Sequence, residues 1–108
     1  MANNISLTIR LPHELNTKLK AISKDVGMTK TNLIRIVIHE LAKGQVELDF
    51  SPDSSSNRDR LVLNVNQLTY DILDNACKQY NQSMNAVVTA ICAAALEYSA
   101  KWLQATEM

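Results

Sequence analysis

The chain opens with a run in which apolar and polar residues alternate without a break, from Ile5 to Leu11. A period of two predicts a β-strand with one buried face and one solvated face. Pro12 ends this strand, because proline cannot donate to a β-ladder and suits the first turn of a helix. The pattern therefore predicts a strand that passes directly into a helix.

Helical spacing replaces the alternation after Pro12. The apolar residues of a first amphipathic helix recur every three or four positions, at Leu15, Leu19, Ile22 and Val26. Gly27 supplies the left-handed residue that ends such a helix, and Thr29 is a good N-cap for the next one. That second helix, residues 33–42, is apolar almost all round, which is typical of a helix buried on several sides.

The second half of the chain repeats this plan at an offset of 54 residues. Its alternating run, amphipathic helix and apolar helix are predicted over residues 60–65, 70–80 and 87–96. Asn81 falls where Gly27 fell, and asparagine is the next-best left-handed residue. Ser83 falls where Thr29 fell, again as a helix cap. Few residues are identical between the halves, so the repeat is one of pattern.

Each half is too small to be stable alone, and each has a single strand with unpaired edges. The two strands are therefore expected to pair, with the apolar helices packed about a two-fold or pseudo-two-fold axis. The predicted fold is mainly α with a two-stranded antiparallel β-ribbon. Residues 45–59, rich in acidic residues and serine, form a connector that is long enough for pairing within one chain or between two chains.

Charge is unevenly distributed along the 108 residues, although the net charge is zero. Taken alone, a zero net charge argues against a nucleic-acid partner. However, residues 1–44 have seven basic and three acidic side chains, the connector 45–59 has a net charge of −3, and residues 60–108 have −1. The first half is thus basic, which favours nucleic acid.

The first half resembles the ribbon–helix–helix family of DNA-binding proteins, the MetJ, Arc and CopG type. The resemblance rests on Ser-Leu-Thr-Ile-Arg-Leu-Pro at 6–12, a helix, and Gly-Met-Thr-Lys-Thr at 27–31 before an apolar helix. It implies two ribbon–helix–helix units, residues 5–44 and 60–104. Two units in one chain are similar to the tandem proteins of this family, among them the TraY-like relaxosome accessory factors of conjugative plasmids.

The resemblance implies that the ribbon enters the major groove of double-stranded DNA and reads bases with its exposed side chains. These are Ser6, Thr8 and Arg10 in the first unit and Arg60, Val62 and Asn64 in the second. Arginine makes bidentate bonds to guanine and asparagine to adenine, while threonine can offer a methyl to thymine. Strands that pair within one chain imply a non-palindromic DNA site, and strands that pair between chains imply a palindromic one.

The family also holds a phosphate at the N-terminus of the second helix of each unit. The matching positions are Thr29, Lys30 and Thr31 in the first unit, and Ser83, Met84 and Asn85 in the second. Ser83 and Asn85 remain candidate phosphate contacts. Because the second unit has Met84 where the first has Lys30, we expect the second unit to bind phosphate more weakly.

The function expected from these features is sequence-specific DNA binding, as a transcriptional regulator such as a repressor or as an accessory factor in DNA transfer. The alternative is a protein–protein adaptor, resembling an antitoxin or a relaxase partner, whose acidic connector and C-terminal helix bind a protein while DNA contact is secondary. A purely structural oligomer is a third possibility. The expected partners are double-stranded DNA, the chain itself through a pseudo-dimer or a homo-oligomer, and a possible protein.

Other classes of function lack support in the sequence. No phosphate-binding loop or nucleophile–base constellation is present, so an enzyme and a cofactor are not expected. His13 and His39 lack metal-ligand spacing. Cys77 and Cys92 are expected to be buried free thiols. No apolar run is long enough to cross a membrane, and the first residues do not resemble a secretory signal, so a cytoplasmic location is expected.

Overall fold

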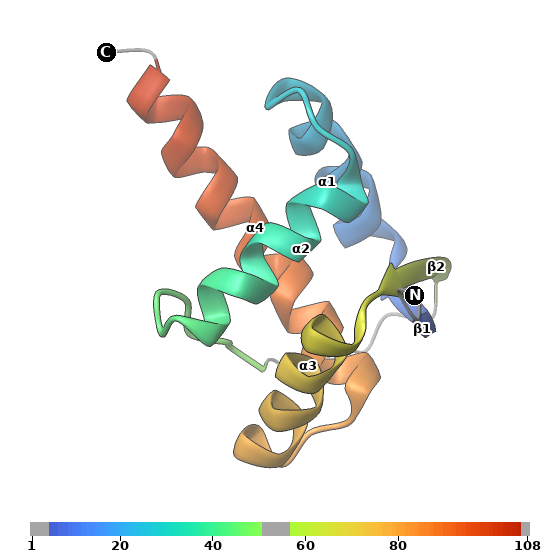
Figure 1. The fold of residues 1–108 in the computed structure, drawn as a ribbon. Helices are drawn as coiled ribbons and strands as arrows, with labels where there is room; N and C mark the ends of the chain where they lie inside the picture. The colour runs from blue at the N-terminus through green and yellow to red at the C-terminus, as the bar shows by residue number, and fades with distance from the viewer. Residues whose placement is uncertain (1–4, 51–56, 107–108) are drawn as a thin grey trace.

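The computed structural model describes residues 5–50 and 57–106. Six elements follow in the order strand, helix, helix, twice over (Figure 1). They are β1 (Ile5–Pro12), α1 (His13–Asp25), α2 (Lys30–Ala42), β2 (Arg58–Val65), α3 (Gln67–Tyr80) and α4 (Met84–Thr106). The predicted fold class, mainly helical with a two-stranded antiparallel ribbon, is confirmed.

The two strands pair with each other within the one chain. The antiparallel register places Ile5 opposite Val65 at one end and Pro12 opposite Arg58 at the other. At the centre, Thr8 faces Val62, the residue 54 positions later. This offset is also the offset of the repeat, so equivalent positions of the two halves meet at the middle of the ribbon. An approximate two-fold axis therefore passes between Thr8 and Val62.

Strand β2 begins at Arg58, two residues before the alternating pattern predicted. The last two residues of the expected connector, 58–59, therefore belong to the ribbon. The alternation is hidden there because Asp59 lies on the same face as buried Leu61, where a polar residue was not expected. Asp59 is hydrogen-bonded to His13 and Asn16 of α1, which compensates for placing a carboxylate on that face.

The inner face of the ribbon packs against the helices. Its buried residues are Ile9, Leu11, Leu61, Leu63 and Val65. Helix α4 contacts the other three helices and β1, and runs through the middle of the molecule in orange and red (Figure 1). The apolar helices α2 and α4 supply much of the core, including Leu33, Ile34, Val37, Ile38, Val87, Val88 and Ile91. An isolated two-stranded ribbon is marginally stable, so this layer of helices holds it together.

The ends of the helices follow the predicted chemistry. Gly27 has a φ of +76° and Asn81 a φ of +53°, so both adopt the left-handed conformation expected where the amphipathic helices end. The Thr29 hydroxyl accepts from the backbone N–H of Asn32 at 3.1 Å, and the Ser83 hydroxyl accepts from that of Ala86 at 3.1 Å. Both predicted N-caps are therefore confirmed.

Both cysteines are free thiols, as expected. Cys92 is fully buried in α4, and this burial raises its pKa to about 12. Cys77 is only half-buried, which differs from the expectation of full burial, and desolvation raises its pKa to a smaller extent. Neither thiol is thus poised as a nucleophile.

The inner face of the ribbon provides a test of the packing. Replacing Leu63, which is fully buried, by alanine should lower the free energy of unfolding by about 2–5 kcal/mol, because it leaves a cavity between ribbon and helices. The control is Leu68→Ala on α3, since Leu68 is 63% exposed and should change stability by less than about 0.5 kcal/mol. Urea denaturation followed by circular dichroism measures both. Equal effects of the two substitutions would contradict this packing.

Candidate nucleic-acid interface

All six residues expected to contact bases lie on the outer, exposed face of the ribbon. They form three cross-strand pairs: Ser6 with Asn64, Thr8 with Val62, and Arg10 with Arg60. Val62 is 44% exposed, which makes it one of the two most exposed large apolar residues of the described chain. The structure therefore brings the six side chains together on one narrow surface, here named the ribbon face.

The three cross-strand pairs of the ribbon face are of the non-hydrogen-bonded type. The N–H and C=O of Arg10 bond outward to Asn85, and the C=O of Asn64 bonds outward to Arg35, so these groups do not bond across the ribbon. The His13 N–H, three residues beyond Arg10, does bond across, to the C=O of Asn57 at 2.9 Å. In an antiparallel pair, residues of the non-hydrogen-bonded type bring their side chains closer together.

This spacing makes the pair of Arg10 and Arg60 electrostatically unfavourable. Like charges directly opposite each other destabilise a sheet. Both side chains are exposed, and neither guanidinium has a hydrogen bond or ion pair with any residue that the structure describes. Two neighbouring cations without an ion-pair partner in the described part of the chain form a surface that an anionic ligand would neutralise.

The outer edge of β1 is fixed at Arg10 by side chains from two other elements. The Asn85 carboxamide of α4 accepts from the Arg10 N–H at 2.8 Å and donates to the Arg10 C=O at 3.2 Å. Arg58 of β2 donates to the same carbonyl at 3.0 Å. Asn85 was expected to contact phosphate, yet here both polar groups of its side chain are bonded to the ribbon backbone. Its position suits it to orient Arg10.

The outer edge of β2 is held in a related way from α2. The Arg35 guanidinium donates to the Asn64 C=O at 2.7 Å. Asn64 lies 54 residues after Arg10 and is its equivalent in the repeat. Helices α4 and α2 therefore hydrogen-bond to the backbone at equivalent positions of β1 and β2, through Asn85 and Arg35. Arg35 is exposed and lies beside the ribbon face, which makes it a cation next to the predicted DNA contacts.

The N-terminus of α2 has groups that could hold an anion. The backbone N–H groups of Lys30 and Thr31 have no hydrogen-bond partner within the described part of the chain, and the helix dipole adds positive potential there. The Thr29 hydroxyl already caps the helix. The Lys30 ammonium donates to the Asn16 side chain at 2.7 Å, and burial together with nearby Lys20 lowers the pKa of Lys30.

Lys30 belongs to a polar network where the ribbon meets α1. Asn16 bridges Lys30 to Asp59, to which it donates at 2.7 Å, and the His13 ring lies 2.9 Å from the same carboxylate. The hydrogen bond from Asn16, followed by that from His13, lowers the pKa of Asp59. This network fastens β2 to α1 and places Lys30 a short distance from the ribbon.

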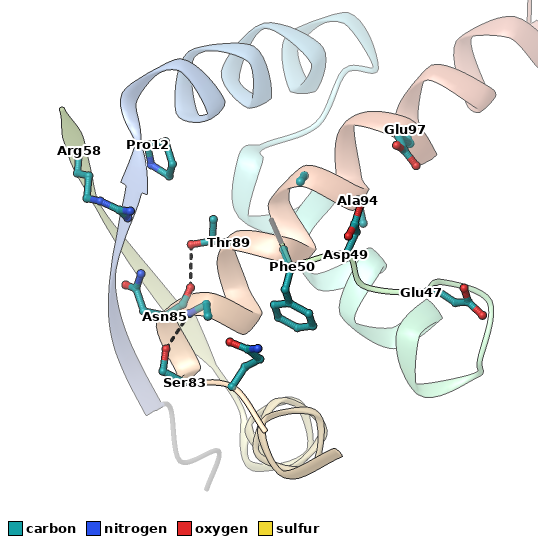
Figure 2. Close-up of a pocket in the computed structure, with 14 residues that line it drawn as sticks. Pro12, Glu47, Asp49, Phe50, Arg58, Ser83, Asn85, Thr89, Ala94 and Glu97 are labelled. Atoms are coloured by element: carbon teal, nitrogen blue, oxygen red, sulfur yellow. Dashed lines mark hydrogen bonds between the residues drawn. The ribbon is translucent and has the colours of Figure 1, made fainter. Parts of the chain in front are cut away.

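A hollow of about 600 Å³ lies between α4, residues 47–50 and the end of the ribbon at Pro12 and Arg58. Figure 2 shows Asn85, Thr89 and Glu97 along α4, with Asp49 and Glu47 on the segment beside it and Arg58 on the ribbon. Alanines of α4 form much of its floor, and none of the ribbon-face residues lines it. Three carboxylates lie beside small side chains at one end of this hollow, and Arg58 lines the end near the ribbon.

No family model, curated protein or solved structure matches this chain.

None of the described helices is long and apolar enough to cross a membrane. Within residues 5–50 and 57–106, no three histidine, cysteine or acidic side chains gather closely enough to hold a metal ion. The fold and the ribbon face define the chain as a small, mainly helical protein with an exposed antiparallel ribbon that carries arginines.

Several residues of this interface were not identified from the sequence. The sequence pattern places Arg58 in the connector, because the alternation cannot be followed past Asp59. Arg35 was assigned to a helix that is apolar almost all round, and nothing in that pattern indicates that it reaches Asn64. Asn16 lies on the polar side of α1, where spacing alone gives it no partner. Only tertiary contacts reveal these roles.

The network around Asp59 predicts a dependence of stability on pH. Because the pKa of Asp59 is lower in the folded chain than in the unfolded chain, its contribution is present at neutral pH and is lost as the pH falls below about 4. The stability difference between the wild-type protein and Asp59→Asn should therefore shrink on acidification.

Urea denaturation at several pH values measures this difference. Asn16→Ala keeps the carboxylate but removes the largest cause of the pKa shift, so its stability should fall less steeply with decreasing pH than that of the wild type. A difference between wild type and Asp59→Asn that stayed constant from neutral to acid pH would contradict the role given to Asp59.

Proposed function

We propose that this chain is a tandem ribbon–helix–helix protein that binds double-stranded DNA by inserting its two-stranded ribbon into the major groove. The observation that carries the proposal is the pair of arginines, Arg10 and Arg60, directly opposite each other on the exposed ribbon face and without an ion-pair partner among the described residues. B-DNA's major groove admits a two-stranded β-ribbon, and arginine is the side chain that most often makes specific contacts to guanine there.

The composition of the ribbon face supports base recognition. Ser6 and Asn64 offer hydrogen-bond donors and acceptors, and Thr8 and Val62 offer methyl groups at the centre. Such groups match the edges of base pairs, where hydrogen bonds and thymine methyls distinguish the bases. Exposed Val62 has no packing role in the core, and contact with a thymine methyl would remove its surface from water.

Phosphate contacts are proposed at both flanks of the ribbon. In the first unit Thr29, Lys30 and Thr31 form the N-terminus of α2, where an anion would meet backbone N–H groups and the Lys30 charge. In the second unit Ser83 and Asn85 are at the same position on α4, but Asn85 is bonded to Arg10 and the lysine is absent. We therefore assign the stronger phosphate site to the first unit, and to Asn85 the role of positioning Arg10.

The biological role that fits this activity is transcriptional regulation, or assistance to DNA transfer by a plasmid or other mobile element. Both roles use the same DNA-binding surface. A role on a bacterial chromosome or plasmid would place the protein in the cytoplasm.

The acidic hollow favours a second candidate, a protein–protein adaptor. Glu47, Asp49 and Glu97 lie at one end of a surface of small side chains on α4, which suits a basic segment of another protein. The hollow and the ribbon face share no residue, although Ser83, Asn85 and Arg58, which lie beside the ribbon, also line the hollow. A chain that bound no DNA but bound a basic protein segment through Glu97 would support the adaptor in place of the DNA-binding protein.

Replacing Arg10 by alanine tests the base-contacting role. We expect DNA affinity to fall by about 1–3 kcal/mol and the preference between sequences to relax, because a bidentate contact to guanine is lost. Fluorescence anisotropy on a duplex selected from random sequence measures the change. Lys78→Ala is the control, because Lys78 pairs with Asp74 on α3 and should leave affinity nearly unchanged. Equal affinity of wild type and Arg10→Ala for every duplex would overturn the proposal.

Replacing Lys30 by alanine tests the phosphate contact. Affinity should fall by a similar factor for specific and unrelated duplexes, and the slope of log affinity against log salt should decrease by about one. Titrations at four salt concentrations give the slope. Because Lys30 bonds to Asn16, the variant Asn16→Ala separates a lost phosphate contact from a disturbed network. A change confined to one sequence would contradict the phosphate role.

A further inference from the structure

The ribbon face has two chemically different ends. The approximate two-fold axis between Thr8 and Val62 makes Arg10 equivalent to Asn64, and Ser6 equivalent to Arg60. If the repeats were identical, both ends of the ribbon face would carry the same pair of side chains. Instead, one end carries two arginines and the other carries a serine and an asparagine.

The charges around the ribbon differ in the same direction. Beyond the arginine end, β1 leads into α1, whose Lys18, Lys20 and Lys24 outnumber its two acidic side chains. Beyond the opposite end, β2 leads into α3, whose Asp71 and Asp74 outnumber its one lysine. Asp59, next to Arg60 in the sequence, is bonded to His13 and Asn16 of α1 and so does not neutralise the arginine end.

The backbone holds both ends in place. Asn85 bonds to the backbone of Arg10 on one edge, and Arg35 bonds to the backbone of Asn64 on the other. Asn85 lies in the first turn of α4 and Arg35 in the second turn of α2, two helices that pack against each other. The two ends therefore differ in what they can bind and not in whether they are held rigidly, which is the condition for selective recognition.

We propose that the ribbon recognises a polar DNA site, with guanines under Arg10 and Arg60 and A·T pairs under Ser6 and Asn64, so that one chain binds in one orientation. This inference rests on the proposed function. Two adjacent guanidinium groups match the O6 and N7 acceptors of guanine, which asparagine cannot match as well. Asn64 pairs bidentately with adenine, and the methyls of Thr8 and Val62 contact thymine in between.

Selection from random duplexes with the purified full-length chain tests this inference. The wild-type protein should select a site without two-fold symmetry, which has guanine at one end and A·T pairs at the other. In the variant Arg60→Asn/Asn64→Arg each end carries one arginine, because the exchanged positions lie on opposite sides of the axis. This variant should select a nearly two-fold symmetric site with guanine at both ends.

A matched control exchanges the same kinds of side chain on α3, outside the ribbon face. The variant Asn75→Arg/Lys78→Asn, at two exposed positions, should select the wild-type site. If circular dichroism shows that the variant Arg60→Asn/Asn64→Arg does not fold, single variants test the inference instead. Arg60→Gln should reduce discrimination at the guanine end by about ten- to a hundredfold and spare the other end, whereas Asn64→Ala should do the reverse.

Failure of this inference and failure of the proposed function give different results. A two-fold symmetric site for the wild-type protein, or single variants that affect both ends equally, would overturn the polar site while DNA binding itself stands. A folded wild-type chain that enriches no sequence, and binds all duplexes as weakly as Arg10→Ala does, would overturn both.

Discussion

The antiparallel pairing of β1 with β2 is the constraint on which the rest of the structure depends. It joins segments more than 45 residues apart, and its register alone decides which side chains share a face. A shift of one residue would turn Leu61, Leu63 and Val65 outward and bury polar side chains. The buried inner face therefore fixes the register, and the register in turn sets Arg10 opposite Arg60. Core packing and the candidate binding surface are consequences of the same pairing.

The ribbon face has an unfavourable pair of charges, and the buried inner face of the ribbon stabilises the strands that carry them. The placement of Arg10 directly opposite Arg60 costs stability, which the buried leucines, Ile9 and Val65 of the inner face offset. Asn85, Arg58 and Arg35 then hold the outer edges. Such an arrangement, in which the fold tolerates repulsion on one rigid surface, is understandable if an anionic ligand relieves the repulsion. The zero net charge of the chain conceals this local positive charge, because the connector and α3 supply the balancing acidic groups elsewhere.

Much of the ribbon face could be predicted from the sequence, because alternation fixes which residues share a side of a strand. All six exposed positions followed from this period of two. The helix caps followed as well, since Thr29 and Ser83 act on backbone groups only three residues away. The roles of Asn85, Arg35 and Asn16 could not be predicted. Each bonds to a residue that is distant in the sequence, and no local pattern records such a partner.

The sequence by itself determined the elements, their order, their buried faces and the caps between them, because periodicity and turn chemistry are local properties. It left open whether the strands pair within a chain, where β2 begins and what surrounds Lys30. Only the tertiary structure decided these points, since they depend on contacts across the chain. Register is the clearest case: the repeat offset of 54 residues was visible in the sequence. That the same offset centres the ribbon on Thr8 and Val62, and so gives it two unlike ends, required the strands to be seen paired.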